Sequence, residues 1–288
     1  NYNTRYPQTR MGVEQYFYDS FYRAKEYGQL KKLDEASKNS KNKKRRKRKN
    51  SEPEKESFRT DLELEALLEI LESKRFITCH SYVQSEINML MHVADSMGFT
   101  LNTFTHILEG YKLADKMKAH GAAASTFSDW WAYKYEVKDA IPHNASILTR
   151  MGVLTSINSD DAEMGRRLNQ EAAKGIRYGG MTEEEALKMV TLNPARIMHI
   201  DEYVGSIKVG KDADIVIWDD HPLSIYAKAQ KTFVDGKLYF DREEMERRKK
   251  RDDLERNRIA GDMIEAAKNG SVTRMPKRKM ERYYHCDT

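Results

Sequence analysis

Two stretches of similar design, Arg75-Phe-Ile-Thr-Cys-His80 and Thr100-Leu-Asn-Thr-Phe-Thr-His106, decide the fold of this chain. Each has the composition of a short β-strand, ends on a histidine, and precedes a helical pattern within a few residues. Val153-Leu-Thr-Ser-Ile-Asn-Ser-Asp160 repeats the design with an aspartate at its end. Strands that alternate with helices in this way predict an α/β protein with a parallel sheet and right-handed crossovers.

The same alternation extends over most of the middle of the chain. Gly98 and Gly121 stand where glycines that end helices belong. The pattern predicts helices over 61–73, 84–97, 111–120, 142–150 and 163–177, and strands over 75–80, 100–106, 122–127 and 153–159.

The character of the sequence changes after residue 180. Thr182-Glu-Glu-Glu185 is a capping-box signal that opens a helix to about residue 192. Short alternating runs then predict an antiparallel accessory sheet with strands at 205–210, 213–218 and 232–240. Asp235-Gly236 is a tight-hairpin signal inside the last run. Residues 242–288 form a charged tail that we expect to be largely helical.

The N-terminal part combines an aromatic helix with a basic segment. The pattern predicts a helix over residues 12–28 that Gly28 ends, and a disordered basic insertion over 31–60. Most of the net charge of +5 comes from the run Lys41–Lys49. Such a run can bind phosphates or an acidic surface, but a solvated insertion is the reading that its Ser, Asn, Pro and Glu neighbours favour. Aromatic residues are not interleaved with it, so we do not expect nucleic-acid binding.

Composition limits the class of protein. With 288 residues, 39% hydrophobic and 33% charged, the chain can bury a substantial core and keep a large solvated surface. Two cysteines, Cys79 and Cys286, argue against a disulfide framework. No run approaches the roughly 18 apolar residues that span a bilayer. Because the chain begins with Asn1, the lack of a visible leader says nothing about its compartment.

His80, His106 and Asp160 are the candidate metal ligands. The carboxyl ends of parallel strands converge on one face of a barrel, so residues distant in sequence can meet there. Two imidazoles and a carboxylate suit a hydrolytic zinc site that keeps a position open for water. Each residue alone has a plain alternative, as a core histidine or a helix cap, but their joint placement favours metal binding. Asp161 competes with Asp160 and is better placed as the cap of the next helix.

Several neighbours of these residues are candidates for substrate contact. Tyr82 and Glu109 follow the two histidine strands, and we take both as tentative substrate-binding residues. Packing explains Tyr111 and Lys112 equally well, and it explains Trp130 and Trp131 better, because large aromatic side chains mostly bury area.

Five longer stretches carry a family resemblance. They are His80-Ser-Tyr82, Thr105-His-Ile-Leu-Glu-Gly-Tyr-Lys112, Ala124-Ser-Thr-Phe-Ser-Asp-Trp-Trp131, Ser156-Ile-Asn-Ser-Asp-Asp161 and Gly205-Ser-Ile-Lys-Val-Gly-Lys-Asp-Ala-Asp-Ile-Val-Ile-Trp218. Together they resemble the amidohydrolase superfamily, in particular its imidazolonepropionase-like branch. The resemblance implies a (β/α)8 TIM-type barrel in which His80, His106 and Asp160 close strands five, six and eight. It also implies a divalent metal, usually zinc, a proton-handling role for Asp160, and a small β-sandwich beside the barrel.

One departure from the family pattern changes the expectation. The His-X-His pair of strand one is absent, and the bridging ligand of an earlier strand is not identifiable. The sequence therefore resembles the C-terminal half of such an enzyme, with half a barrel over 61–200, part of a sandwich over 201–241, and a remnant helical segment at 1–30. We expect a hydrolase of non-peptide carbon–nitrogen bonds in cyclic amide substrates. Alone, without the missing N-terminal half, we expect this chain to be inactive and to bind metal weakly.

Two other hypotheses stay open. The first is a non-catalytic scaffold or nucleic-acid-binding protein that uses the Lys41–Lys49 run on a degenerate hydrolase frame. The second is an inactive remnant produced by truncation or a frameshift.

Overall fold

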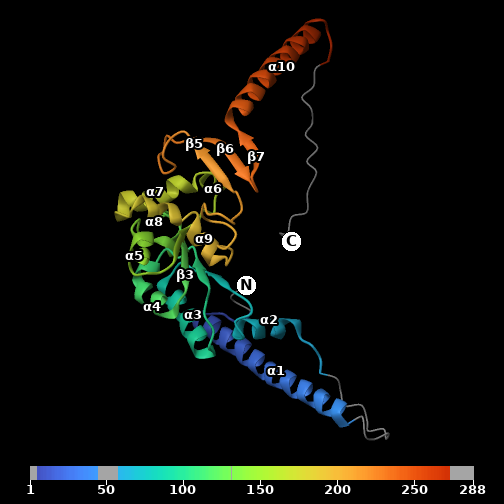
Figure 1. Cartoon of the computed structure of the whole chain (residues 1–288), viewed down its shortest axis with the longest axis vertical. Helices are drawn as coiled ribbons and strands as arrows, with labels where there is room; N and C mark the ends of the chain where they lie inside the picture. The colour runs from blue at the N-terminus through green and yellow to red at the C-terminus, as the bar shows by residue number, and fades with distance from the viewer. Residues whose placement is uncertain (1–4, 45–57, 131, 273–288) are drawn as a thin grey trace. The chain divides into compact units, whose positions relative to one another are not determined.

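The computed structural model describes residues 5–44, 58–130 and 132–272, with backbone only for residues 40–44. Contacts divide the chain into two units (Figure 1). The first comprises Asn1–Asp212 with Asp220–Ala227, and the second comprises Ala213–Asp219 with Lys228–Thr288.

The first unit is built on a parallel sheet of four strands in sequential order. They are β1 (Thr78–His80), β2 (Thr103–Thr105), β3 (Ala123–Thr126) and β4 (Thr155–Ile157). All three pairings are parallel, which confirms the predicted alternation of strand and helix. The hydrogen-bonded strands are shorter than the predicted runs. Closure into a (β/α)8 barrel stays a prediction.

Burial of the strand residues increases from β1 to β4. The residues of β3 and β4 are all buried, whereas β1 alternates between exposed and half-buried positions. The outer side of β4 is occupied by the chain itself, because Ile157 N donates to Met189 O at 3.0 Å and Asn193 Nδ2 donates to Thr155 O at 2.8 Å. These two bonds satisfy strand groups that an edge would otherwise leave unpaired.

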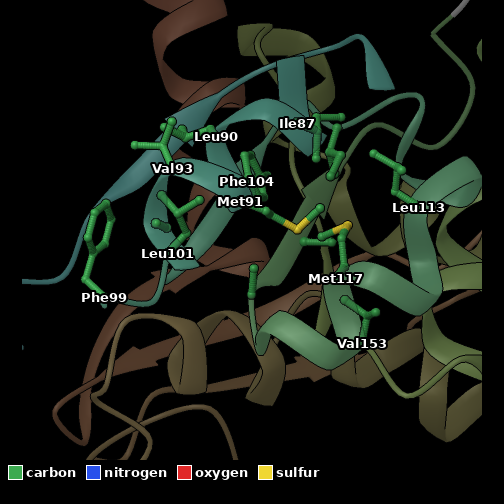
Figure 2. Close-up of a cluster of buried hydrophobic side chains, with 14 of the residues drawn as sticks. Ile87, Leu90, Met91, Val93, Phe99, Leu101, Phe104, Leu113, Met117 and Val153 are labelled. Carbon is green, nitrogen blue, oxygen red and sulfur yellow. The ribbon is translucent and has the colours of Figure 1, made fainter. Parts of the chain in front are cut away.

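A hydrophobic core lies between the sheet and helices α3 (Gln84–Met97) and α4 (Ala114–His120). α3 presents buried residues at helical spacing, and β2 contributes Phe104 from the sheet. Burying one such side chain stabilises the fold by roughly 1.5–3 kcal/mol. Figure 2 shows how this cluster converges, with Ile87, Leu90, Met91, Val93, Phe99, Leu101, Phe104, Leu113, Met117 and Val153 labelled.

Local signals set the ends of several helices. Gly98 and Gly121 adopt left-handed conformations with φ of 82° and 92°, as predicted for glycines that end α3 and α4. Thr182 and Glu185 form the predicted capping box of α8 (Glu183–Lys188). The remaining helices of this unit are η1 (Gly110–Leu113), η2 (Tyr135–Val137), α5 (Asn144–Arg150), α6 (Ala162–Gly165), α7 (Leu168–Gly179) and α9 (Leu192–Ile197).

The prediction of one helix over residues 163–177 was wrong. Arg167 leaves the helical region with φ of −129°, which separates α6 from α7. The new helix axis lets α7 bury Ala172, Gly175 and Gly179. Packing of this face therefore overrides the continuous helical pattern of the sequence.

The prediction that Gly28 ends the first helix was also wrong. α1 runs from Arg10 to Lys44, so residues 31–44 of the predicted disordered insertion are helical. Gly28 instead allows the close approach of α2 (Leu62–Leu71), because a Cβ at this position would lie 2.7 Å from Leu68 Cδ1. Side chains of the basic run Lys41–Lys49 lie outside the described part of the chain.

The second unit contains an antiparallel sheet of β5 (Ile215–Trp218), β6 (Ala229–Val234) and β7 (Lys237–Asp241). Asp235 and Gly236 have φ of 49° and 72°, which confirms the predicted two-residue hairpin. The predicted strand at 205–210 is a loop in the structure, because Gly205 and Gly210 both take positive φ. A second layer that would make a β-sandwich stays a prediction.

The tail predicted from residue 242 begins with α10 (Arg242–Lys268), a helix with no buried residue. Glu244 pairs with Arg247 and Arg248, and Arg258 pairs with Glu255 and Asp262, at the three- and four-residue spacings that support exposed helices. In the described residues, no helix combines the length and the hydrophobicity needed to cross a bilayer.

Candidate metal and substrate site

His80 and His106 meet at the carboxyl ends of adjacent strands. His80 is the last residue of β1 and pairs in register with Thr105, the last residue of β2. His106 follows directly, and its ring lies 4.5 Å from the His80 ring, centroid to centroid, with 76° between the planes. The parallel pairing therefore brings together two of the three predicted ligands.

The backbone at His106 is unusual. Its φ of 59° lies in the left-handed region, which costs a non-glycine residue about 1–3 kcal/mol. The turn after it is held on both sides, because Ile107 N donates to Ser125 O at 3.3 Å and Ile107 O accepts from Asn144 Nδ2 at 2.7 Å. The fold thus fixes a strained conformation that aims this imidazole.

The surroundings of His106 favour the neutral form of its ring. Burial lowers the pKa of His106, the nearby His80 and Lys134 lower it further, and Asp160 opposes them. A neutral imidazole is the form that binds metal. The Nδ1 atom of His106 is buried and has no hydrogen-bond partner.

Asp160 and Asp161 have different positions after β4. Asp161 caps α6, because its Oδ1 accepts from Glu163 N at 2.8 Å and Met164 N at 3.0 Å. Asp160 is exposed, and its charge acts on His106 and on Tyr133. The described residues contain no group of three or more His, Cys, Asp or Glu side chains placed to hold a metal ion. The predicted three-ligand set is therefore not assembled, although its members share one region.

Three unpaired polar atoms favour a bound group in this region. Besides His106 Nδ1, the Ser81 Oγ and Asn158 Oδ1 atoms are buried without a partner. Ser81, His106 and Asn158 each directly follow a strand, namely β1, β2 and β4. A buried unpaired polar group costs about 1–3 kcal/mol, so such atoms call for a ligand, an ion or water. Of the three, the imidazole nitrogen of His106 is a usual ligand of zinc, whereas the hydroxyl and amide oxygens suit water or a substrate. The sequence analysis did not identify Ser81 and Asn158.

Aromatic side chains line the histidine pair. The Tyr82 ring makes an edge contact with His80 at 4.8 Å, and the buried Phe127 ring lies 4.6 Å from His106, centroid to centroid. Trp130 stacks on Phe127 at 4.4 Å. That Tyr82 binds substrate stays a prediction. Trp131 lies outside the described residues.

Glu109 links two loops of the site. It is buried, its Oε2 accepts from Gln84 N at 2.9 Å, and it forms an ion pair with Lys112 at 3.3 Å. These are structural contacts, and a contact of Glu109 with substrate stays a prediction. Lys112 also pairs with Asp139 at 2.7 Å, while Tyr111 donates from its hydroxyl to Asp139 O at 2.9 Å.

The loop of residues 128–139, which we call the β3 loop, is anchored at both ends. At its start, Ser128 Oγ donates to the buried carboxylate of Glu171 on α7. Lys174, also on α7, forms an ion pair with Asp129 at 2.9 Å. At its end, the contacts of Asp139 described above hold it. No motif in the sequence indicated this anchoring, because it joins residues 27 to 45 positions apart.

Comparisons with known proteins give a consistent result. The sequence pattern described as "Amidohydrolase family" matches residues 31–239. A protein named amidohydrolase tasK from Hapsidospora irregularis is 28% identical over 243 residues, which are 83% of this chain and 24% of that protein. An imidazolonepropionase from Thermoplasma volcanium is 28% identical over 55% of this chain and 40% of its own length.

A solved structure gives the same result for the fold. The crystal structure of an amidohydrolase from Thermotoga maritima is similar with a TM-score of 0.70 and 28% identity, over 83% of this chain and 58% of that one. The chain thus spans between about a quarter and about three-fifths of the length of these relatives.

Proposed function

This chain belongs to the amidohydrolase family, and on that basis we propose that it supplies the metal-binding part of a hydrolase that cleaves non-peptide carbon–nitrogen bonds in cyclic amides. The observation that carries the proposal is the pair of histidine rings at the ends of adjacent parallel strands, 4.5 Å apart. The unpaired Nδ1 of His106 in the same place supports it. Packing alone would not leave such a nitrogen unsatisfied.

Each residue has a distinct role in this proposal. His80 and His106 would hold zinc, and Asp160 would complete the ligands. Zinc supplies a water of lowered pKa and polarises a carbonyl group. Asp160 would accept the proton of the attacking water at its carboxylate and return it to the departing nitrogen. The lowered pKa of His106 keeps its imidazole available for metal to a lower pH than usual.

The family pattern also limits what this chain does alone. Without a His-X-His pair, the residues described here give an incomplete ligand set. We therefore propose that zinc binds weakly to the isolated chain and that hydrolysis requires a second segment with the strand-one histidines. The cyclic amide class rests on the similarity to an imidazolonepropionase.

Zinc titration tests the metal site directly. Isothermal titration calorimetry of the full chain should show one zinc site that His80→Ala, His106→Ala and Asp160→Asn each weaken at least about tenfold, a loss of about 1.4 kcal/mol. His92→Ala is the matched control, because His92 is an exposed histidine of α3 and should not change the affinity. Equal zinc affinity of the His80→Ala and His106→Ala variants and the unaltered chain would remove the proposal.

A complementation experiment tests the activity. The chain is co-expressed with the N-terminal half of a homologous amidohydrolase, and five-membered cyclic amides are assayed with zinc. We expect hydrolysis by the pair and none by either part. Hydrolysis that survives replacement of Asp160 by asparagine would contradict the role of this carboxylate.

A further inference from the structure

We propose that Lys134 and Tyr82 form an anion-binding subsite beside the histidine pair, which selects substrates that carry a carboxylate near the scissile carbon–nitrogen bond. The proposal rests on the hydrolase function above and adds a substrate class to it. None of the sequence motifs pointed to Lys134, whose position follows from the path of the β3 loop.

The geometry places a positive charge one ring away from the histidines. Lys134 Nζ lies 3.9 Å from the centroid of the Tyr82 ring. That ring in turn lies 4.8 Å from His80 and 6.0 Å from His106, centroid to centroid. The aromatic face attracts the ammonium group and holds it beside the Tyr82 ring.

Unlike Lys112 and Lys174, Lys134 has no anionic partner among the described residues. Lys174 and Lys112 both form ion pairs, with Asp129 and Asp139, and thereby anchor the loop. Within the described part of the chain, no carboxylate lies within ion-pair distance of Lys134 Nζ, although the charge of this lysine reaches His106. An ammonium group that is held in place but unpaired is available to an anionic ligand.

Tyr133 adds a hydrogen-bond donor to the subsite. Its ring lies 5.4 Å from Lys134 Nζ and makes an edge contact with Trp130. Partial burial raises the pKa of Tyr133, and its contact with the Tyr82 hydroxyl and the charges of Asp160 and Glu136 raise it further. The phenol therefore keeps its proton. A carboxylate beside it could accept a hydrogen bond as well as pair with Lys134.

Two carboxylates near the subsite oppose the binding of an anion. The charges of Asp160 and Glu136 act on Tyr133, and both would repel a carboxylate. The positive charge of Lys134 would compensate for these negative charges. The preference for an anion should consequently disappear when its charge is removed.

The test measures binding and needs no catalysis. N-acetylglycine and N-acetylglycinamide are titrated into the full chain, with a chelator present, and chemical shifts are followed by NMR. These probes share an amide and differ in one charge. We expect the carboxylate to bind at least about tenfold more tightly than the amide, a difference of about 1.4 kcal/mol.

Substitutions assign this preference to one side chain. Lys134→Met should abolish the preference, and Lys134→Arg should keep it. Lys138→Met is the matched control, because Lys138 lies over the Tyr135 ring at 4.7 Å in the same loop but does not influence the pKa of His106. It should leave the preference intact.

Three outcomes would overturn the subsite. They are equal binding of the two probes, no binding of either at millimolar concentration, and a preference that survives Lys134→Met. The chelator keeps this result separate from the metal site, because zinc itself attracts carboxylates. Loss of the subsite would leave the zinc titration unaffected. Failure of the zinc titration would remove the hydrolase proposal while the charge preference could still be observed.

Discussion

Asn144 offers the sharpest test of how the site is held. This side chain is 1% exposed and makes three hydrogen bonds. Its Nδ2 donates to Ile107 O at 2.7 Å and to Thr126 Oγ1 at 2.9 Å, and its Oδ1 accepts from Tyr111 N at 2.8 Å. It thereby joins the turn after His106 to β3 and to η1.

The loss of stability in Asn144→Ala can be worked out from the hydrogen-bonding groups that Asn144 now satisfies. Tyr111 N would lose its partner, at about 1–3 kcal/mol for a buried group, whereas Ile107 O still accepts from Gly110 N at 3.2 Å. Thr126 is less affected, because its Oγ1 still donates to Phe127 O at 3.2 Å. We therefore expect the free energy of unfolding to fall by about 1–3 kcal/mol. Zinc affinity should fall too, because the turn that fixes the strained backbone of His106 would be released.

The measurement is urea unfolding followed by far-ultraviolet circular dichroism. Asn88→Ala is the matched control, because Asn88 Oδ1 accepts from Lys116 Nζ at 2.9 Å in an exposed contact. It should change the free energy of unfolding by less than about 0.5 kcal/mol. A loss below about 1 kcal/mol in Asn144→Ala, or an equal loss in the control, would refute the reasoning.

Three further predictions concern packing and titration. A Cβ at Gly179 would overlap Ser146, so Gly179→Ala should destabilise by about 1 kcal/mol despite its better helix propensity. Ser146→Gly should rescue this variant and Ser146→Ala should not, as read by urea unfolding. Burial raises the pKa of Cys79 to about 11, so with the other cysteine replaced, iodoacetamide at pH 8 should react about a hundredfold more slowly than with a free thiol. Hydrogen bonds from Lys31 and Tyr27 lower the pKa of Glu65, so its contribution is present above about pH 4.3 and is lost as the pH falls through the lowered value. Unfolding free energies between pH 6 and pH 3 should therefore decline less in Glu65→Gln than in the unaltered chain.

Features with a local cause could be predicted from the sequence. The glycine at position 98 ends its helix because a left-handed residue is needed there, and Asp235-Gly236 turns its hairpin for the same reason. The strand order follows from the strict alternation with helices, and the two histidines meet because each closes one of two neighbouring strands.

Features that depend on distant partners could not be predicted. Gly28 carries the same local signal as Gly98, yet its role is set by Leu68, forty residues away. Likewise, Lys134 and Lys138 both lie over tyrosine rings, and only the fold distinguishes the one beside the histidines. The unpaired atoms of Ser81 and Asn158 are visible only once every other hydrogen bond is assigned.

The two-ended anchoring of the β3 loop separates the residues that hold the loop from the side chains between its anchors. Its ion pairs with α7 and with the segment after β2 hold the frame, while Trp130, Tyr133 and Lys134 project from the stretch between them. Substitutions in that stretch can replace these aromatic and cationic side chains without breaking the contacts that anchor the loop. A protein with this arrangement could therefore bind new ligands after a few substitutions and lose little thermal stability.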